Sequence, residues 1–236
     1  GVALMLLGAA FCSLLLMGAM VLVKDLIGLL AYPVARSFSQ TLLTSPPLIG
    51  TLAGLSILLS AIGVWNAVKV PAVKTVEITL PNLPAAFDGF RMVQLTDLHA
   101  SRLLQAPWFS AVVAKTNALN PDLTVITGDM VDGTTAARAE DVRPLQLLNA
   151  KYGVLAIPGN HEYYSGYQDW LSAFRNLGLH MLVNEHVTIT HENDNQHIVI
   201  AGITDHAANR FGLPEPDINA ALDQVSPDDT VILLSH

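Results

Sequence analysis

The chain has 236 residues, of which 51% are hydrophobic and 14% are charged, and its net charge is −8. Residues 1–73 carry a net charge of +2 and residues 74–236 carry −10, so the two parts differ in chemical character. An acidic second part without a basic stripe argues against nucleic acid as the main partner. The single cysteine, Cys12, excludes a disulfide bond within the chain.

Two apolar runs without a charge, residues 2–23 and 47–68, each contain 22 residues. As helices, both are long enough to cross a bilayer core of roughly 30 Å. They could instead be buried helices of a globular core, and the first could be a signal peptide, although signal sequences usually have a shorter apolar part. We expect two transmembrane helices in a membrane region, residues 1–73. We also expect a multi-pass location, in a bacterial cell membrane. Basic residues follow both runs, so the side that holds the rest of the chain is not indicated.

Residues 24–46 suggest an interfacial helix followed by a loop, and residues 76–80 alternate as an entry strand does. Beyond them, apolar strand patterns alternate with helical patterns, which predicts an α/β domain with a largely parallel sheet over residues 74–236. The expected strands are 91–96, 123–127, 154–157, 187–190, 198–203 and 231–234. The expected helices are 107–119, 135–150, 167–177 and 217–224.

Potential metal ligands follow four of these expected strands. They are Asp97, His99, Asp129, Asn160 and His236. Open α/β sheets place their sites beyond the carboxyl ends of the strands, where such side chains converge. Carboxylate, imidazole and amide donors without thiolate suit Mn²⁺, Fe or Zn²⁺. The pattern therefore predicts a site for two divalent metals, which together activate a water and hold a phosphoryl group.

The first two motifs each have a simpler alternative. Asp97 and His99 lie two residues apart, so in extended backbone they face one side and can share a metal, although Asp97 could merely cap a turn. Gly128 permits a sharp exit from its strand, after which Asp129 offers two oxygens to bridge two cations. Asp129 could instead cap a helix. Asp132 is expected to orient the loop or a ligand rather than to bind metal.

The third motif, Gly159-Asn160-His161-Glu162, is the most specific of the four. Asn160 offers a neutral oxygen ligand. His161 is suited to contact a substrate phosphate or to protonate the leaving oxygen, because histidine is the side chain that ordinarily gains and loses a proton near neutral pH. A polar turn has little reason to place Asn and His together. His236 could be only a histidine at a strand end, but its place among the other ligands favours a metal role.

In this order, the four motifs resemble the calcineurin-like metallophosphoesterase superfamily, whose pattern is D-x-H, G-D-x-x-D, G-N-H-[ED], a later H and then G-H-x-H. The segment Gly159–Tyr164 together with Gly202–Asp205 resembles a membrane-associated YkuE/YaeI-like branch. The resemblance covers residues 74–236. It implies a sandwich of two β-sheets flanked by helices, here preceded by two transmembrane helices.

The resemblance also implies roles for individual residues. Asp97 and His99 would bind the first metal, Asp129 would bridge both, and Asn160 and His236 would bind the second. His161 would be the catalytic histidine beside the phosphate. The Gly-His-x-His element is missing after His236, so we expect a fragment that is incomplete at its C-terminus and inactive by itself.

We therefore expect the full-length protein to be a membrane-anchored phosphoester hydrolase in which a hydroxide bridging two divalent metals attacks phosphorus. Because the domain is held close to a membrane, a lipid-linked phosphate is a reasonable substrate hypothesis. One alternative is a membrane-bound binding or sensor protein that keeps the fold without catalysis. A transport subunit is a third alternative, which apolar spans without intramembrane charge support little.

Overall fold

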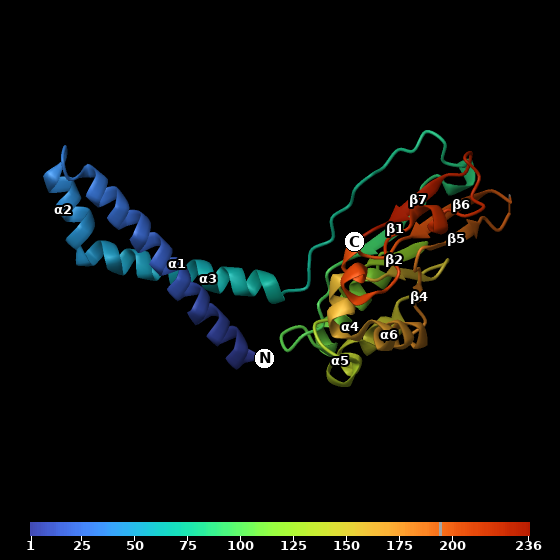
Figure 1. The fold of residues 1–236 in the computed structure, drawn as a ribbon, viewed down its shortest axis with the longest axis horizontal. Coiled ribbons are helices and arrows are strands. Elements are labelled where there is room, and N and C mark those ends of the chain that lie inside the picture. The colour runs from blue at the N-terminus through green and yellow to red at the C-terminus, as the bar shows by residue number, and fades with distance from the viewer. Residues whose placement is uncertain (194) are drawn as a thin grey trace. The chain divides into compact units, whose positions relative to one another are not determined.

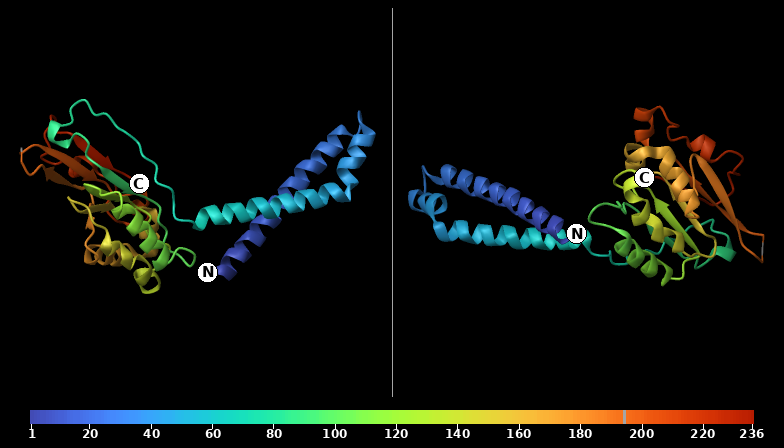
Figure 2. Two further views of the ribbon diagram at one scale, coloured as in Figure 1. Left: turned by 180° about the vertical axis from the view of Figure 1, so that it is seen from behind. Right: turned by 90° about the horizontal axis from the view of Figure 1, so that it is seen from below.

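The computed structural model describes residues 1–193 and 195–236, which divide into two compact units, Gly1–Lys69 and Val70–His236 (Figures 1 and 2). The start of the second unit is tied to its core. Val70 packs against buried side chains there, and Lys115 Nζ donates a hydrogen bond to Pro71 O at 2.6 Å. A domain boundary after residue 73, as the charge pattern suggests, stays a proposal.

The first unit consists of three helices, α1 (Val2–Ala31), α2 (Arg36–Thr44) and α3 (Pro46–Val68). Ser45 begins α3, because its Oγ accepts a hydrogen bond from Leu48 N at 3.4 Å and prolines occupy the first turn. Helices α1 and α3 pack along each other (Figure 2). Both are long and apolar enough to cross a membrane.

Helix α1 continues beyond the charge-free run as far as Ala31, and its first charged residue, Lys24, has polar partners. Lys24 is buried, and its Nζ donates to Leu42 O at 2.8 Å and pairs with the Asp25 carboxylate. Ser39 Oγ donates to Gly28 O at 2.7 Å. These polar contacts hold α2 against the last turns of α1.

The first sheet of the second unit is parallel, in the order β1 (Met92–Leu95), β2 (Leu123–Thr127), β3 (Val154–Ile157) and β4 (His180–Met181). Three helices, α4 (Ala106–Asn117), α5 (Thr135–Val142) and α6 (Asn160–Asn176), cover one face of this sheet (Figure 1). The opposite face packs against the second sheet.

The second sheet contains β5 (Glu185–Thr190), β6 (His197–Gly202) and β7 (Val231–Leu234), with β5 antiparallel and β7 parallel to β6. The sheets approach closely at Gly202, where an added Cβ would lie 2.5 Å from Leu182 Cβ. Short helices complete the unit. They are η1 (Ala85–Phe87), η2 (Arg143–Leu147), η3 (His206–Phe211) and α7 (Ile218–Ala221).

Strands β2 and β3 contribute side chains to two hydrophobic cores, because successive side chains of a strand point to opposite faces of its sheet. On one face, Ile126 and Ala156 join the core under the helices. On the other, Val125 and Leu155 join the core between the sheets. The expected α/β fold with a parallel sheet, a second sheet and two long apolar helices is confirmed.

Several expected elements differ from the structure. The helix expected at 217–224 is the shorter α7, and helix α2 lies where a loop was expected. The entry strand at 76–80 was wrong, since this segment is exposed and forms no strand; alternation alone cannot replace a pairing partner. The helix expected at 135–150 ends at Val142, because Pro144 follows, and becomes the 3₁₀-helix η2. Helix α6 begins at Asn160, earlier than expected, and is kinked at Gly166, where φ is 104°.

Candidate metal centre

The loops after β1 and β2 run side by side and are held in register by backbone hydrogen bonds. His99 N donates to Asp129 O at 3.0 Å, and Ala100 N donates to Met130 O at 2.9 Å. In the opposite direction, Asp132 N donates a hydrogen bond to Ala100 O at 2.9 Å. This ladder extends the β1–β2 pairing past the strand ends, so it places the first motif directly against the second.

The backbone at this ladder takes a conformation that residues other than glycine rarely adopt. Asp97, His99 and Asp129 have φ values of 53°, 45° and 54°. Such left-handed residues cost of order 1–3 kcal/mol each and persist only where the surroundings hold them, often at functional sites. Here the ladder holds them, and it turns all three side chains toward a common space.

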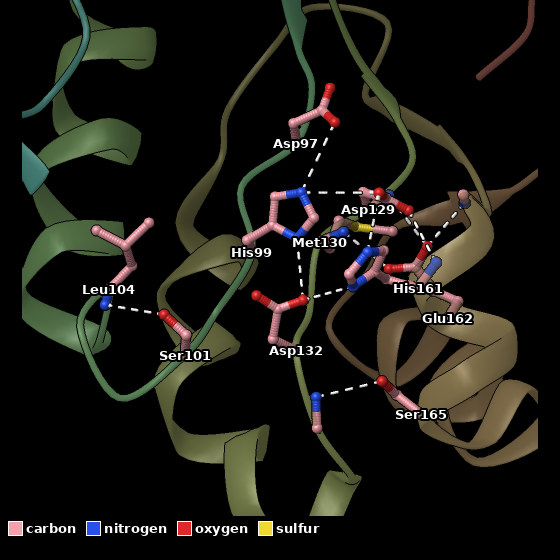
Figure 3. A network of polar contacts seen from close by, with 12 residues as sticks. Asp97, His99, Ser101, Leu104, Asp129, Met130, Asp132, His161, Glu162 and Ser165 are labelled. Atoms are coloured by element: carbon pink, nitrogen blue, oxygen red, sulfur yellow. Dashed lines mark hydrogen bonds and ion pairs between the residues drawn. The ribbon is translucent and has the colours of Figure 1, made fainter. Parts of the chain in front are cut away.

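The carboxylate of Asp129 lies at the centre of the cluster (Figure 3). It is only 5% exposed, and its Oδ2 faces Nε2 of three histidines: His99 at 3.6 Å, His161 at 3.9 Å and His236 at 3.4 Å. His236 follows β7 and the other two follow β1 and β3, so both sheets contribute to one site.

Each of these histidines has an acceptor oxygen at its other ring nitrogen. Asp132 Oδ1 lies 3.0 Å from His99 Nδ1 and 2.5 Å from His161 Nδ1 (Figure 3). Thr127 O lies 2.7 Å from His236 Nδ1. An acceptor at Nδ1 places the ring proton there and leaves the Nε2 lone pair directed at Asp129. This is the tautomer that a metal-binding or proton-accepting histidine needs.

The ligand atoms form two groups that share one residue. His99, Asp129 and His161 make one group, and Asp97, Asp129 and His236 make the other; within each, the ligand atoms lie within 4.8 Å of one another. Asp97 Oδ1 is also 3.7 Å from His99 Nε2, so these two side chains remain close enough to share an ion.

Asn160 is the first residue of α6 and is partly buried. Among the residues that the structure describes, its side-chain amide makes no hydrogen bond, so its oxygen is available to a ligand. It is next to Gly159, which lies directly against Asp129: an added Cβ at Gly159 would meet Asp129 Oδ1 at 2.2 Å.

Glu162 has a role that sequence reasoning missed. Its fully buried carboxylate accepts hydrogen bonds from Gly159 N at 2.7 Å, Met130 N at 2.8 Å and Asp129 N at 3.0 Å. Burial raises the pKa of Glu162 to about 7, against the three N–H groups, which lower it. Glu162 thus joins the loop after β2 to the start of α6. Its place three residues after Gly159, typical of a capping box, is the signal that could have revealed it.

The charge of this cluster suits bound cations. Asp97, Asp129 and Asp132 lie around the same histidines, and within the described parts of the chain no lysine or arginine pairs with them. Burial lowers the pKa of His236, but the bond to Thr127 O and the nearby Asp129 and Asp97 outweigh it and raise the pKa overall. Nitrogen and oxygen donors around buried negative charge fit divalent metals.

A two-sheet α/β sandwich with a shared aspartate between two clusters of His and Asp ligands defines a metallophosphoesterase domain. Residues 90–236 match the calcineurin-like phosphoesterase family, and the chain belongs to it. The predicted family and the expected metal-binding character are therefore confirmed.

The chain is also similar to curated relatives. It is 35% identical over 185 residues to a bovine (Bos taurus) transmembrane protein with metallophosphoesterase domain. The aligned region covers 75% of this chain and 42% of that protein. It is 32% identical to an uncharacterised metallophosphoesterase of Campylobacter jejuni (79% and 48% covered). It is 33% identical to the uncharacterised metallophosphoesterase YkuE of Bacillus subtilis (70% and 57%). The chain spans about half the length of these relatives.

Proposed function

We propose that the complete protein is a membrane-anchored phosphoester hydrolase that uses two divalent metal ions. The observation that carries the proposal is the position of Asp129. Its carboxylate belongs to both candidate ligand groups, with two further ligands in each. When bound there, two cations would supply an activated water and stabilise the charge that develops on the phosphoryl group.

We assign the residues as follows. Asp129 would be shared by the two ions, Asp97 and His99 would hold the first, and Asn160 and His236 would hold the second. The compact ligand groups pair these donors differently, because they place Asp97 with His236 and His99 with His161. His161 is the proton donor to the leaving oxygen, because its side chain is 37% exposed and its Nε2 faces the centre of the site. Its Nε2 also lies in one ligand group, so His161 is close enough to contact a phosphate held at that position. Asp132 accepts hydrogen bonds from Nδ1 of both rings, which leaves Nε2 of His99 free to bind a metal and makes Nε2 of His161 the nitrogen that would carry the donated proton.

The assignment is tested on the full-length protein loaded with Mn²⁺. We expect two metals per chain and release of p-nitrophenol from p-nitrophenyl phosphate or bis-p-nitrophenyl phosphate. Asp129→Asn should lose at least one metal and most turnover, since the bridging ligand loses its charge. Unchanged metal content and turnover in this variant would contradict the bridging role. Metal binding without turnover on any phosphoester would favour a binding or sensor protein instead.

For the substrate, we propose a lipid-linked phosphate in the cell membrane. The support is that α1 and α3 are long and apolar enough to span a bilayer in the same chain as the hydrolase domain. The test compares phosphatidate in vesicles with a water-soluble phosphomonoester, and a phospholipid diester with its soluble counterpart. We expect the lipid substrates to be hydrolysed with the higher kcat/KM; equal values for lipid and soluble substrates would remove this part of the proposal.

A further inference from the structure

Two aromatic side chains border the candidate metal centre. In the described part of residues 70–236, Tyr164 and Phe211 are the only exposed aromatic residues, at 51% and 46% exposure. Their ring centroids lie 5.8 Å apart, and the Tyr164 ring lies 5.7 Å from that of His161. The rest of the aromatic residues in this unit are buried or partly buried. Exposed aromatic area therefore gathers beside His161, one of the three histidines that face Asp129.

Both rings are held by ordered structure. Tyr164 lies three residues after His161 on α6, so the two side chains share a helix face. Phe211 ends η3, whose first turn is capped by Asp205 Oδ1 accepting from Ala207 N at 2.7 Å. Beneath the pair, the buried Tyr163 ring lies 6.2 Å from Phe211 and stacks on Tyr167 at 4.4 Å.

Exposed apolar area of this kind is costly in water and commonly marks a binding surface. We propose that Tyr164 and Phe211 form a platform that binds the aliphatic part of the substrate while its phosphoryl group occupies the metal centre. The proposal rests on the hydrolase function above and identifies the residues that select a lipid-like ester. Tyr164 and Phe211 are specificity-determining residues. The contact between Tyr164 and His161 places them beside the phosphoryl group that reacts.

The ring geometry favours an aliphatic chain over a nucleobase. The planes of Tyr164 and Phe211 are inclined at 51°, so the two rings are not parallel walls between which a flat group could stack. A planar base gains most from a parallel aromatic face at stacking distance. A flexible chain can follow both inclined surfaces and gains free energy for each methylene that leaves water.

The test measures binding of methylphosphonate and octylphosphonate, below its micelle concentration, to the full-length Mn²⁺-loaded protein in lipid nanodiscs by calorimetry. Both probes present the same anionic group to the metals. We expect octylphosphonate to bind more tightly. We expect the octyl-to-methyl affinity ratio to fall about tenfold in the double variant Tyr164→Ala/Phe211→Ala. A change of this size corresponds to about two methylene groups of the octyl chain that are no longer removed from water.

Two further variants separate the platform from other effects. Tyr164→Phe keeps the ring and should keep the ratio; a fall in methylphosphonate affinity there would assign the hydroxyl to phosphate binding and overturn the proposal. Leu147→Ala removes exposed apolar area at the end of η2 and should leave the ratio as it is; a fall as large as in the double variant would show that octylphosphonate binds exposed apolar surface without selection and would overturn the proposal.

The outcomes also distinguish this inference from the hydrolase assignment. If methylphosphonate does not bind the metal-loaded protein, the metal-centre function fails. If both phosphonates bind but the ratio is the same in the wild type and the double variant, only the platform fails. Tighter binding of adenosine 5′-monophosphate than of octylphosphonate, lost in the same double variant, would overturn the aliphatic assignment in favour of a base.

Discussion

The two aspartates of the loop after β2 face opposite nitrogens of the same histidines. Asp129 faces Nε2 of His99 and His161, whereas Asp132 faces their Nδ1 atoms. A single buried loop therefore supplies both a candidate ligand and the group that orients two other candidates. Their different positions predict different consequences when each is changed.

Asp132→Asn should weaken metal binding without removing a ligand. An uncharged amide oxygen accepts the two Nδ1–H bonds more weakly than a carboxylate does, so the two rings are held less firmly, and changes of this type typically cost 10- to 100-fold in metal affinity. Metal titration of the full-length protein measures the effect. Asp229→Asn is the matched control, because Asp229 pairs with His197 at 3.0 Å in the second sheet. Equal affinities in the two variants would contradict the role of Asp132.

Glu162→Gln should lower the stability of the folded protein. The carboxylate accepts three backbone N–H bonds, and an amide placed there turns an NH₂ donor toward at least one of these donors. Leaving buried polar groups unsatisfied costs about 1–3 kcal/mol. Thermal unfolding of the metal-free protein measures it. An unchanged melting temperature would show that Glu162 does not join the two loops.

At the scale of elements, the site depends on how closely the turn after β3 approaches the loop after β2. Gly128 and Gly159 face each other there: a Cβ on Gly128, whose φ is 89°, would lie 2.6 Å from Gly159 Cα. Helix α6 starts at this contact and carries His161, Glu162 and Tyr164 in its first turns. The position of the helix therefore fixes a candidate catalytic group, a structural clamp and the edge of the platform together.

Gly159→Ala should impair both stability and metal binding, because the new methyl group would overlap Asp129 Oδ1. Overpacking of this kind typically costs about 1–3 kcal/mol. Gly202→Ala is the matched control, since its Cβ would overlap Leu182 between the sheets. We expect both variants to melt at lower temperature, and only Gly159→Ala to show weaker metal binding in the folded state. Comparable metal affinity in both would show that Asp129 tolerates displacement.

At the scale of the whole molecule, the two units are connected by a segment with little structure of its own. Residues 71–80 are all exposed, and they include the apolar side chains Val76 and Ile78. The apolar helices lie before this segment and the metal centre after it. The helices that are long and apolar enough to cross a membrane and the candidate metal centre thus lie in separate parts of the chain.

Trypsin should cleave the full-length protein in membranes first after Lys74, because exposed and irregular backbone is the preferred site of proteolysis. The fragment that begins at Thr75 should leave the membrane pellet while the apolar helices stay. Immunoblotting and N-terminal sequencing of the released fragment check this. Lys74→Gln should slow its release; initial cleavage within residues 90–236 would contradict the division into units.

Sequence pattern alone was sufficient for the elements whose signal is local. The strands β2, β3 and β7 lie where their apolar runs predict, since each run is short, continuous and bounded by turn residues. The order of the ligand motifs was enough to predict the family. The two-residue strand β4 and the early start of α6 were missed, because a short edge strand and a helix that begins in a ligand motif have little periodicity.

Tertiary structure decided which groups meet. The sequence does not indicate that residues 76–80 remain unpaired, that Asp132 contacts two histidines at once, or that Glu162 also accepts N–H groups from the loop after β2. The contact of His236 with Thr127 O joins the ends of two different sheets and depends on how closely they pack. Strand and helix formation follow from the spacing of neighbouring side chains. Contacts between loops far apart in the sequence depend on the packing of the sheets and helices that carry them.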